Sequence, residues 1–182
     1  PGRSGVSDET LTTVDSGSGT FRFGHTNDFY GGFPVTNFWS GPIKLFAEMQ
    51  VVGATNVTLD LRGAIGTMSG TGESLYGAMK GALWLTGTNN NTLTYLMLTD
   101  GQLHLAKAPG VRGVGLELYA YDYAGSVPEV HVDAPDQLVG TPFVRLDGAK
   151  LFLHDYPTRL NSFVANEDFV YVYCGTNPGS SL

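Results

Sequence analysis

The 182-residue chain has little cysteine and little charge for its length. Cys174 is its only cysteine, which excludes a disulfide framework within the chain, and we expect it to be an inert, mostly buried side chain. Charged residues make up 15% of the chain, whereas globular proteins average about 25%. The 25 glycines, with many Ser, Thr and Asn, replace the usual Lys and Glu of a protein surface. This composition is typical of extracellular β-proteins.

Clusters of positive charge and long apolar runs are also absent from the sequence. Ten Lys and Arg residues are scattered between Arg3 and Arg159, against 17 Asp and Glu, for a net charge of −7. Because nucleic acids and anionic membranes are bound through basic surfaces, we expect no nucleic-acid partner for this segment. No apolar run approaches the roughly 18 residues of a membrane span, so we also predict no membrane insertion.

The domain organisation follows from length and from the composition of the two ends. A chain of this size fits one domain, which we place at residues 20–175. Residues 1–19 and 176–182 are linker-like, rich in Gly, Ser and Pro. We therefore expect a module of a longer polypeptide.

Alternation of apolar and polar residues predicts an all-β fold. The segment 56–63 places Val57, Leu59 and Leu61 on one face. The segment 114–125 alternates Leu116, Leu118, Ala120 and Asp122 with Glu117 and three tyrosines. Such signals recur at intervals of about 8–12 residues, which favours an antiparallel β-sandwich of the jelly-roll type. Helical patterning is limited to residues 73–80, so we predict at most one short helix.

Two Asp-Gly pairs lie between alternating segments, at Asp100-Gly101 and Asp147-Gly148. Asp-Gly favours the type I′ turn of a β-hairpin, because both central residues of that turn need a positive φ. We predict a hairpin at each pair. We attribute the likeness of the two segments to shared turn chemistry and not to an internal repeat.

The catalytic patterns in the sequence are incomplete. Ser74 lies near glycines but misses the spacing of a nucleophile elbow by one residue. Glu117 and Asp122 lie on a Tyr-rich strand, yet their spacing puts them on opposite faces, where they cannot share a glycosidase cleft. We predict no catalytic residue.

One segment carries the residue types of a metal site. Glu129, His131 and Asp133 alternate along one strand face, and His154 and Asp155 lie near a strand end. A solvent-facing polar strand produces the same alternation without any ligand. We therefore predict no metal ion and no cofactor.

Two segments combine the residue types that recognise sugars. Residues 24–41 mix aromatic rings with polar side chains, and residues 86–94 form a polar tip between strands. The predicted binding residues are Asn27, Asp28, Tyr30, Asn89, Asn90 and Asn91. Because five exposed rings would form an unusually large apolar patch, we expect Phe33 and Trp39 to be largely buried.

The acidic, Gly/Thr/Asn-rich β-module, and in particular the segment SGTFRFGHTNDFYGGFPVTNFWSGPIKLFAEMQ, resembles the protruding (projection) domain of small non-enveloped RNA virus capsid proteins. The resemblance implies a β-sandwich on the virion surface, joined to the rest of the capsid protein and self-associating as a dimer or trimer. Its outer loops would attach to a host-cell receptor or glycan. The His-Ser pair of some such domains is absent, since Thr26 follows His25.

Three alternatives stay open beside host attachment. The first is a carbohydrate-binding module or lectin-like domain, and the second is a hydrolase on a β-scaffold. The third is a trimerisation head of the C1q or tumour-necrosis-factor type, with Tyr119, Tyr121 or Tyr123 on its axis.

Overall fold

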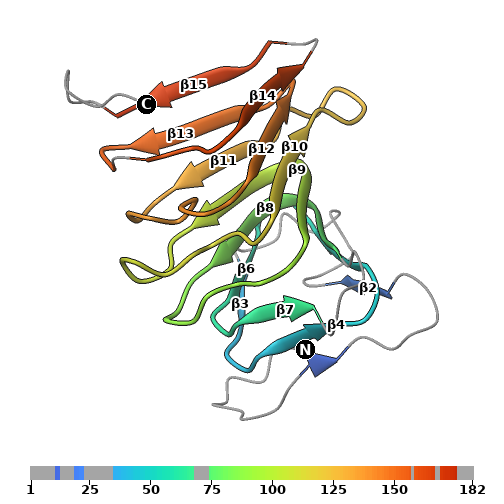
Figure 1. The fold of residues 1–182 in the computed structure, drawn as a ribbon. Coiled ribbons are helices and arrows are strands. Elements are labelled where there is room, and N and C mark those ends of the chain that lie inside the picture. The colour runs from blue at the N-terminus through green and yellow to red at the C-terminus, as the bar shows by residue number, and fades with distance from the viewer. Residues whose placement is uncertain are drawn as a thin grey trace.

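The chain folds as a parallel β-solenoid (Figure 1). The computed structural model describes residues 11–12, 19–22, 35–67, 74–156, 158–166 and 169–175. Every pairing between the strands in these ranges is parallel, so the predicted antiparallel jelly-roll sandwich is wrong. The described residues contain no helix, and therefore none that could cross a membrane. The predicted helix at 73–80 is instead part of a long strand.

The described strands succeed one another as rungs of the solenoid. They are β1 (Leu11–Thr12), β2 (Gly19–Arg22), β3 (Val35–Trp39), β4 (Ile43–Leu45), β5 (Met49–Gly53), β6 (Val57–Leu61), β7 (Ile65–Thr67), β8 (Ser74–Leu85), β9 (Tyr95–Leu105), β10 (Glu117–Tyr121), β11 (Glu129–Val132), β12 (Phe143–Asp147), β13 (Lys150–His154), β14 (Phe163–Asn166) and β15 (Tyr171–Cys174). The number of residues between paired positions of successive coils varies along the chain. Val144 pairs with Phe163, 19 residues on, whereas Leu103 pairs with Val130, 27 residues on.

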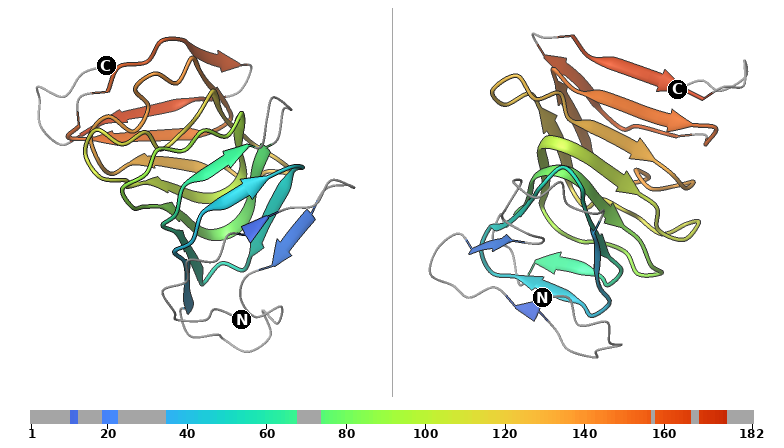
Figure 2. Two further views of the ribbon diagram at one scale, coloured as in Figure 1. Left: turned by 60° about the horizontal axis from the view of Figure 1, so that its bottom comes forward. Right: turned by 180° about the vertical axis from the view of Figure 1, so that it is seen from behind.

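Each coil contributes one rung to each of two long sides of the solenoid (Figure 2). Side A runs β2-β5-β8-β9-β10-β12-β14, and side B runs β3-β6-β8-β9-β11-β13-β15. The long strands β8 and β9 serve both sides, because they bend where their register shifts, between Ala78 and Ala82. A short third side consists of β1, β4 and β7.

Columns of aliphatic side chains fill the interior. On side B one such column is Leu59, Leu83, Leu103, Val130 and Leu151. All of these side chains are buried, and burying one Leu or Val stabilises the fold by about 1.5–3 kcal/mol. The shared face predicted for Val57, Leu59 and Leu61 is buried, and so are Leu118 and Ala120. Leu116, predicted on the same face as Leu118, precedes β10 and is 43% exposed.

The two Asp-Gly pairs turn the chain from side A to side B, so the predicted hairpins are wrong. Asp100-Gly101 forms the bend within β9, and Asp147-Gly148 lies between β12 and β13. Gly101 and Gly148 have φ values of 63° and 61°. The positive φ that the dipeptide favours is thus present, but it serves a solenoid corner. The likeness of the two segments does reflect a structural repeat.

Candidate functional site

The outer surface of side B carries two parallel rows of side chains, each with one residue per coil. The ring column contains Trp84, His104, His131, Phe152 and Tyr173. The polar row contains Thr58, Ala82, Gln102, Glu129 and Lys150. The rows arise because the parallel register places equivalent residues of successive coils directly beside one another.

The ring column is a continuous stack. Trp84 and His104 lie 4.0 Å apart between ring centroids, at an interplanar angle of 3°. The next three centroid distances along the column are 4.6, 4.5 and 4.5 Å, with angles of 11°, 4° and 5°. Each ring from His104 to Phe152 therefore has both faces covered. A ligand would meet the edges of these rings, which for the two imidazoles include the nitrogen atoms.

Asp133, which follows β11, brings three imidazoles of successive coils together. Its Oδ2 lies 2.7 Å from Nδ1 of His104, and its Oδ1 lies 3.2 Å from Nε2 of His154. Nδ1 of His131 lies 3.3 Å from the same Nε2 of His154. These four side chains are named the imidazole cluster.

Burial and mutual charge decide the protonation of the imidazole cluster. Burial, together with the neighbouring His104 and His154, lowers the pKa of His131 below its ordinary value, so this ring is neutral at neutral pH. Burial alone would raise the pKa of Asp133, but the hydrogen bond from His104 and the charge of the imidazoles lower it overall. The cluster thus combines an ionised carboxylate with at least one neutral imidazole.

The polar row is also held by specific contacts. Lys150 Nζ donates to Glu129 Oε1 at 2.8 Å, and Gln102 Nε2 donates to Glu129 Oε2 at 3.0 Å. These bonds outweigh the effect of burial and lower the pKa of Glu129, while the carboxylate raises the pKa of Lys150. The second nitrogen of two clustered histidines faces this row: His104 Nε2 lies 3.4 Å from Gln102 Oε1, and His131 Nε2 lies 3.5 Å from Glu129 Oε2.

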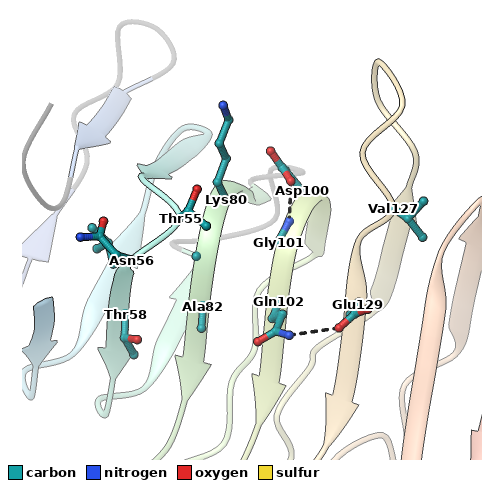
Figure 3. Close-up of a pocket in the computed structure, with 12 residues that line it drawn as sticks. Thr55, Asn56, Thr58, Lys80, Ala82, Asp100, Gly101, Gln102, Val127 and Glu129 are labelled. Carbon is teal, nitrogen blue, oxygen red and sulfur yellow. Dashed lines mark hydrogen bonds between the residues drawn. The ribbon is translucent and has the colours of Figure 1, made fainter. Parts of the chain in front are cut away.

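A groove of about 550 Å³ runs beside the polar row, at the corner between sides A and B. Figure 3 shows Lys80 and Asp100 projecting at this corner and Gln102 bonded to Glu129 across neighbouring strands. The residues that line the groove are Thr55, Asn56, Val57, Thr58, Lys80, Gly81, Ala82, Asp100, Gly101, Gln102, Val127 and Glu129. The small side chain of Ala82 and the two glycines keep the centre of the groove low. The groove therefore crosses successive coils along the solenoid axis.

The structure separates the residues predicted for binding. Asn27, Asp28 and Tyr30 lie outside the described residues. Asn89 and Asn90 are exposed on a loop. Asn91 is fully buried: its Oδ1 accepts from the backbone of Ile65, and its Nδ2 donates to the carbonyl of Gly113. The role of these residues in binding stays a prediction, and Asn91 has a structural role in addition.

Other residues considered from the sequence are placed as follows. Ser74 is buried and donates to Glu48, not to a histidine. Glu117 lies on side A, 3.9 Å from Arg145, and Asp122 accepts from the backbone of Gly125 in the following turn. Trp39 is half-buried, while Phe33 lies outside the described residues. Cys174 is a free, half-buried thiol that packs against the core.

Sequence reasoning found part of the imidazole cluster and missed its centre. The alternation of Glu129, His131 and Asp133 was recognised, but nothing linked them to His104. The missing signal was the coil offset: His104 precedes His131 by one coil, and the two residues are register partners. The groove was missed for the same reason, since its lining residues come from four separate strands and the loops beside them.

Comparisons with known proteins return no match, neither to a family model nor to a curated protein nor to a solved structure. The β-sandwich implied by the resemblance to capsid projection domains is replaced by the solenoid. Virion location, self-association and a bond to the rest of a capsid protein stay predictions.

Proposed function

We propose that the chain is a non-enzymatic recognition module that binds a neutral oligosaccharide along the groove beside the polar row. The observation that carries this proposal is the groove itself, which crosses successive coils and is lined mainly by hydroxyl, amide and charged side chains. A solenoid presents such an extended surface because each coil repeats the one before it. An elongated polar polymer fits that shape better than a compact ligand does.

The charges of the groove favour a neutral ligand. Lys80 is exposed at one end, and Glu129 is neutralised by Lys150. Oδ1 of Asp100 accepts from the backbone of Gly101 and from the hydroxyl of Ser126. With a net charge of −7 over the whole chain, a polyanion would be repelled at long range. Hydroxyl-rich sugars, in contrast, can exchange hydrogen bonds with Thr, Asn and Gln.

This proposal keeps the glycan-binding part of the function predicted from the sequence and moves it to a different surface. The inner rings of the ring column contribute edges and not faces, because they are covered by their neighbours on both sides. Stacking of sugar rings, expected from residues 24–41, therefore has no platform on these inner rings. Attachment to a host cell is one context for the same binding and stays a prediction.

The test is a glycan array probed with the full chain, followed by calorimetric titration of the sugars that bind. Ala82→Trp places a bulky side chain in the low centre of the groove, and Lys80→Ala removes its exposed cation. We expect Ala82→Trp to abolish binding and Lys80→Ala to weaken it roughly 10-fold or more, as a lost hydrogen bond to a charged group does. Lys44→Ala is the matched control, because Lys44 is an exposed strand lysine on the third side.

Two results would overturn the proposal. Failure of the unmodified chain to bind any sugar would remove it altogether. Binding that survives Ala82→Trp but is lost in Asn89→Ala would place recognition on the loop tip, as the sequence predicted. Circular dichroism of every variant checks that the solenoid is intact.

A further inference from the structure

We propose that the imidazole cluster is a binding site for a transition-metal dication of the zinc class, with His104, His131, His154 and Asp133 as ligands. The four ligands lie outside the groove lining, and the site meets the groove only through the outer contacts Gln102 and Glu129. Three imidazoles with one carboxylate form a ligand set that suits zinc and the neighbouring first-row metals.

The spacing of the donor atoms matches a tetrahedral site. Zinc binds nitrogen and oxygen at about 2.0–2.2 Å, so two ligand atoms of a tetrahedron lie roughly 3.3 Å apart. Nε2 of His154 lies 3.3 Å from Nδ1 of His131 and 3.2 Å from Oδ1 of Asp133. The ligand atoms of His104, His131 and Asp133 all lie within 4.8 Å of one another. The rings of His104 and His131 are stacked at an interplanar angle of 11°, so they must tilt to aim their in-plane lone pairs at one ion.

The fold holds the ligands in place by two independent devices. The ring column clamps His104 and His131 between flat neighbours, which leaves only their edges accessible. His154 is aimed at them by a local irregularity of β13: the register shifts between Phe152 and His154, and His154 has a φ of 49°. A bulge re-aims a side chain, and strained backbone of this kind concentrates at functional sites.

The outer contacts are those of a metal-bound histidine. A ligating imidazole usually donates its second N–H to an oxygen, which fixes the ring and its tautomer. If Nδ1 of His104 and His131 face the ion, Nε2 of His104 faces Gln102 Oε1 at 3.4 Å and Nε2 of His131 faces Glu129 Oε2 at 3.5 Å. Nε2 of His131 is otherwise a buried nitrogen without a hydrogen-bond partner. Gln102 and Lys150 in turn hold Glu129.

Proton balance is simple for this site. In the absence of metal, one proton is shared in the 2.7 Å contact between Nδ1 of His104 and Oδ2 of Asp133. A dication takes the place of that proton at Nδ1 and bonds to both lone pairs, and the displaced proton moves to Nε2 of His104, which faces Gln102 Oε1. Metal binding requires neutral imidazoles and an ionised carboxylate. Binding should therefore weaken as the pH falls.

The test is calorimetric titration of Zn²⁺ into the tag-free full chain, after metal has been removed with a chelator. We expect one ion per chain and a rise in the melting temperature. Asp133→Asn and His154→Gln keep the shape of the side chain closely enough to fold, and each should weaken binding roughly 100-fold or more. Asp136→Asn is the matched control, because Asp136 is exposed three residues after Asp133 and Asn tolerates its positive φ.

The proposal is overturned if the unmodified chain binds no Zn²⁺, or if both ligand variants bind as tightly as it does. Circular dichroism in the absence of metal separates loss of the site from loss of the fold. Lys80→Ala, at a position outside the ring column and outside the outer contacts of the cluster, should leave Zn²⁺ binding unchanged, so failure of the sugar proposal and failure of this one are distinguishable.

Discussion

Lys107 shows how a single buried charge is accommodated in the solenoid wall. Its side chain is 1% exposed, and its ammonium donates to the carbonyl oxygens of Thr86, at 2.9 Å, and Gly63, at 3.3 Å. Burial lowers the pKa of Lys107 to about 8, and the charge of Asp60 opposes this only in part. Nothing in the sequence around position 107 distinguished this lysine from the exposed ones, because its burial depends on the loops of other coils.

The stability of the chain should rise with pH between about 8 and 10 because of Lys107. In this range the unfolded chain keeps the lysine proton while the folded chain loses it, so the free energy of unfolding grows by up to about 1.4 kcal/mol per pH unit. Above pH 10 the raised pKa of Tyr121, about 12, acts in the opposite direction. Urea denaturation across pH 7–10 measures the slope.

Two variants isolate the contribution of Lys107 to that slope. Lys107→Met should remove the rise, whereas Lys44→Met, which deletes an exposed lysine, should retain it. An equal slope in the unmodified chain and in Lys107→Met would show that the folded chain keeps this lysine charged up to its ordinary pKa.

At the scale of single elements, the corners decide whether a coil can close. Gly101, with a φ of 63°, forms the bend of β9, and a Cβ atom there would overlap the carbonyl oxygens of Met79 and Gly81. Gly110 also has a positive φ, of 76°, but nothing lies within 4 Å of the position of its Cβ. Alanine substitutions at Gly101 and Gly110 therefore distinguish steric overlap from backbone strain, because both positions have a positive φ but only Gly101 has close neighbours.

Gly101→Ala should destabilise the chain by more than about 4 kcal/mol, since the overlapping atoms belong to the backbone of the neighbouring coil and cannot move aside. Gly110→Ala is the control and should cost only the strain of a left-handed alanine, about 1–2 kcal/mol. Urea denaturation gives both values. Equal losses in the two variants would mean that the corner relaxes and that close packing of coils does not restrict it.

The strands could be predicted from the sequence, but their partners could not. Alternation identified the buried faces of β6 and β10, because each solenoid strand has one buried face and one face toward solvent, as in an antiparallel sandwich. Asp-Gly at 100–101 and 147–148 indicated a positive φ, which a hairpin and a solenoid corner share. The deciding feature is the return of the chain after each coil. The offset between paired residues is irregular, 19 residues from Val144 to Phe163 but 32 from Leu11 to Ile43, and this irregularity hides the repeat.

On the scale of the whole molecule, the solenoid is a one-dimensional stack. Each coil contacts only the coils before and after it, so stability is approximately a sum over coils and their interfaces. The strands β8 and β9 are paired on both edges and carry fully buried leucines. All residues of β14 and β15 are half-buried or exposed, including Tyr171 and Tyr173 at 47% and 44%. The middle coils are therefore packed more tightly than the last coil.

Amide hydrogen exchange should follow this gradient. We expect the amides of β14 and β15 to exchange roughly 100-fold faster than those of β8 and β9, because the outer coil opens without disturbing the others. Leu151→Ala in β13 should speed exchange in β13 and β15 and leave β8 unchanged, whereas Leu103→Ala in β9 should speed exchange across the whole stack. Mass spectrometry of exchanged peptides resolves the coils. Uniform exchange in all coils, with both substitutions acting everywhere, would instead show that the solenoid opens as one cooperative unit.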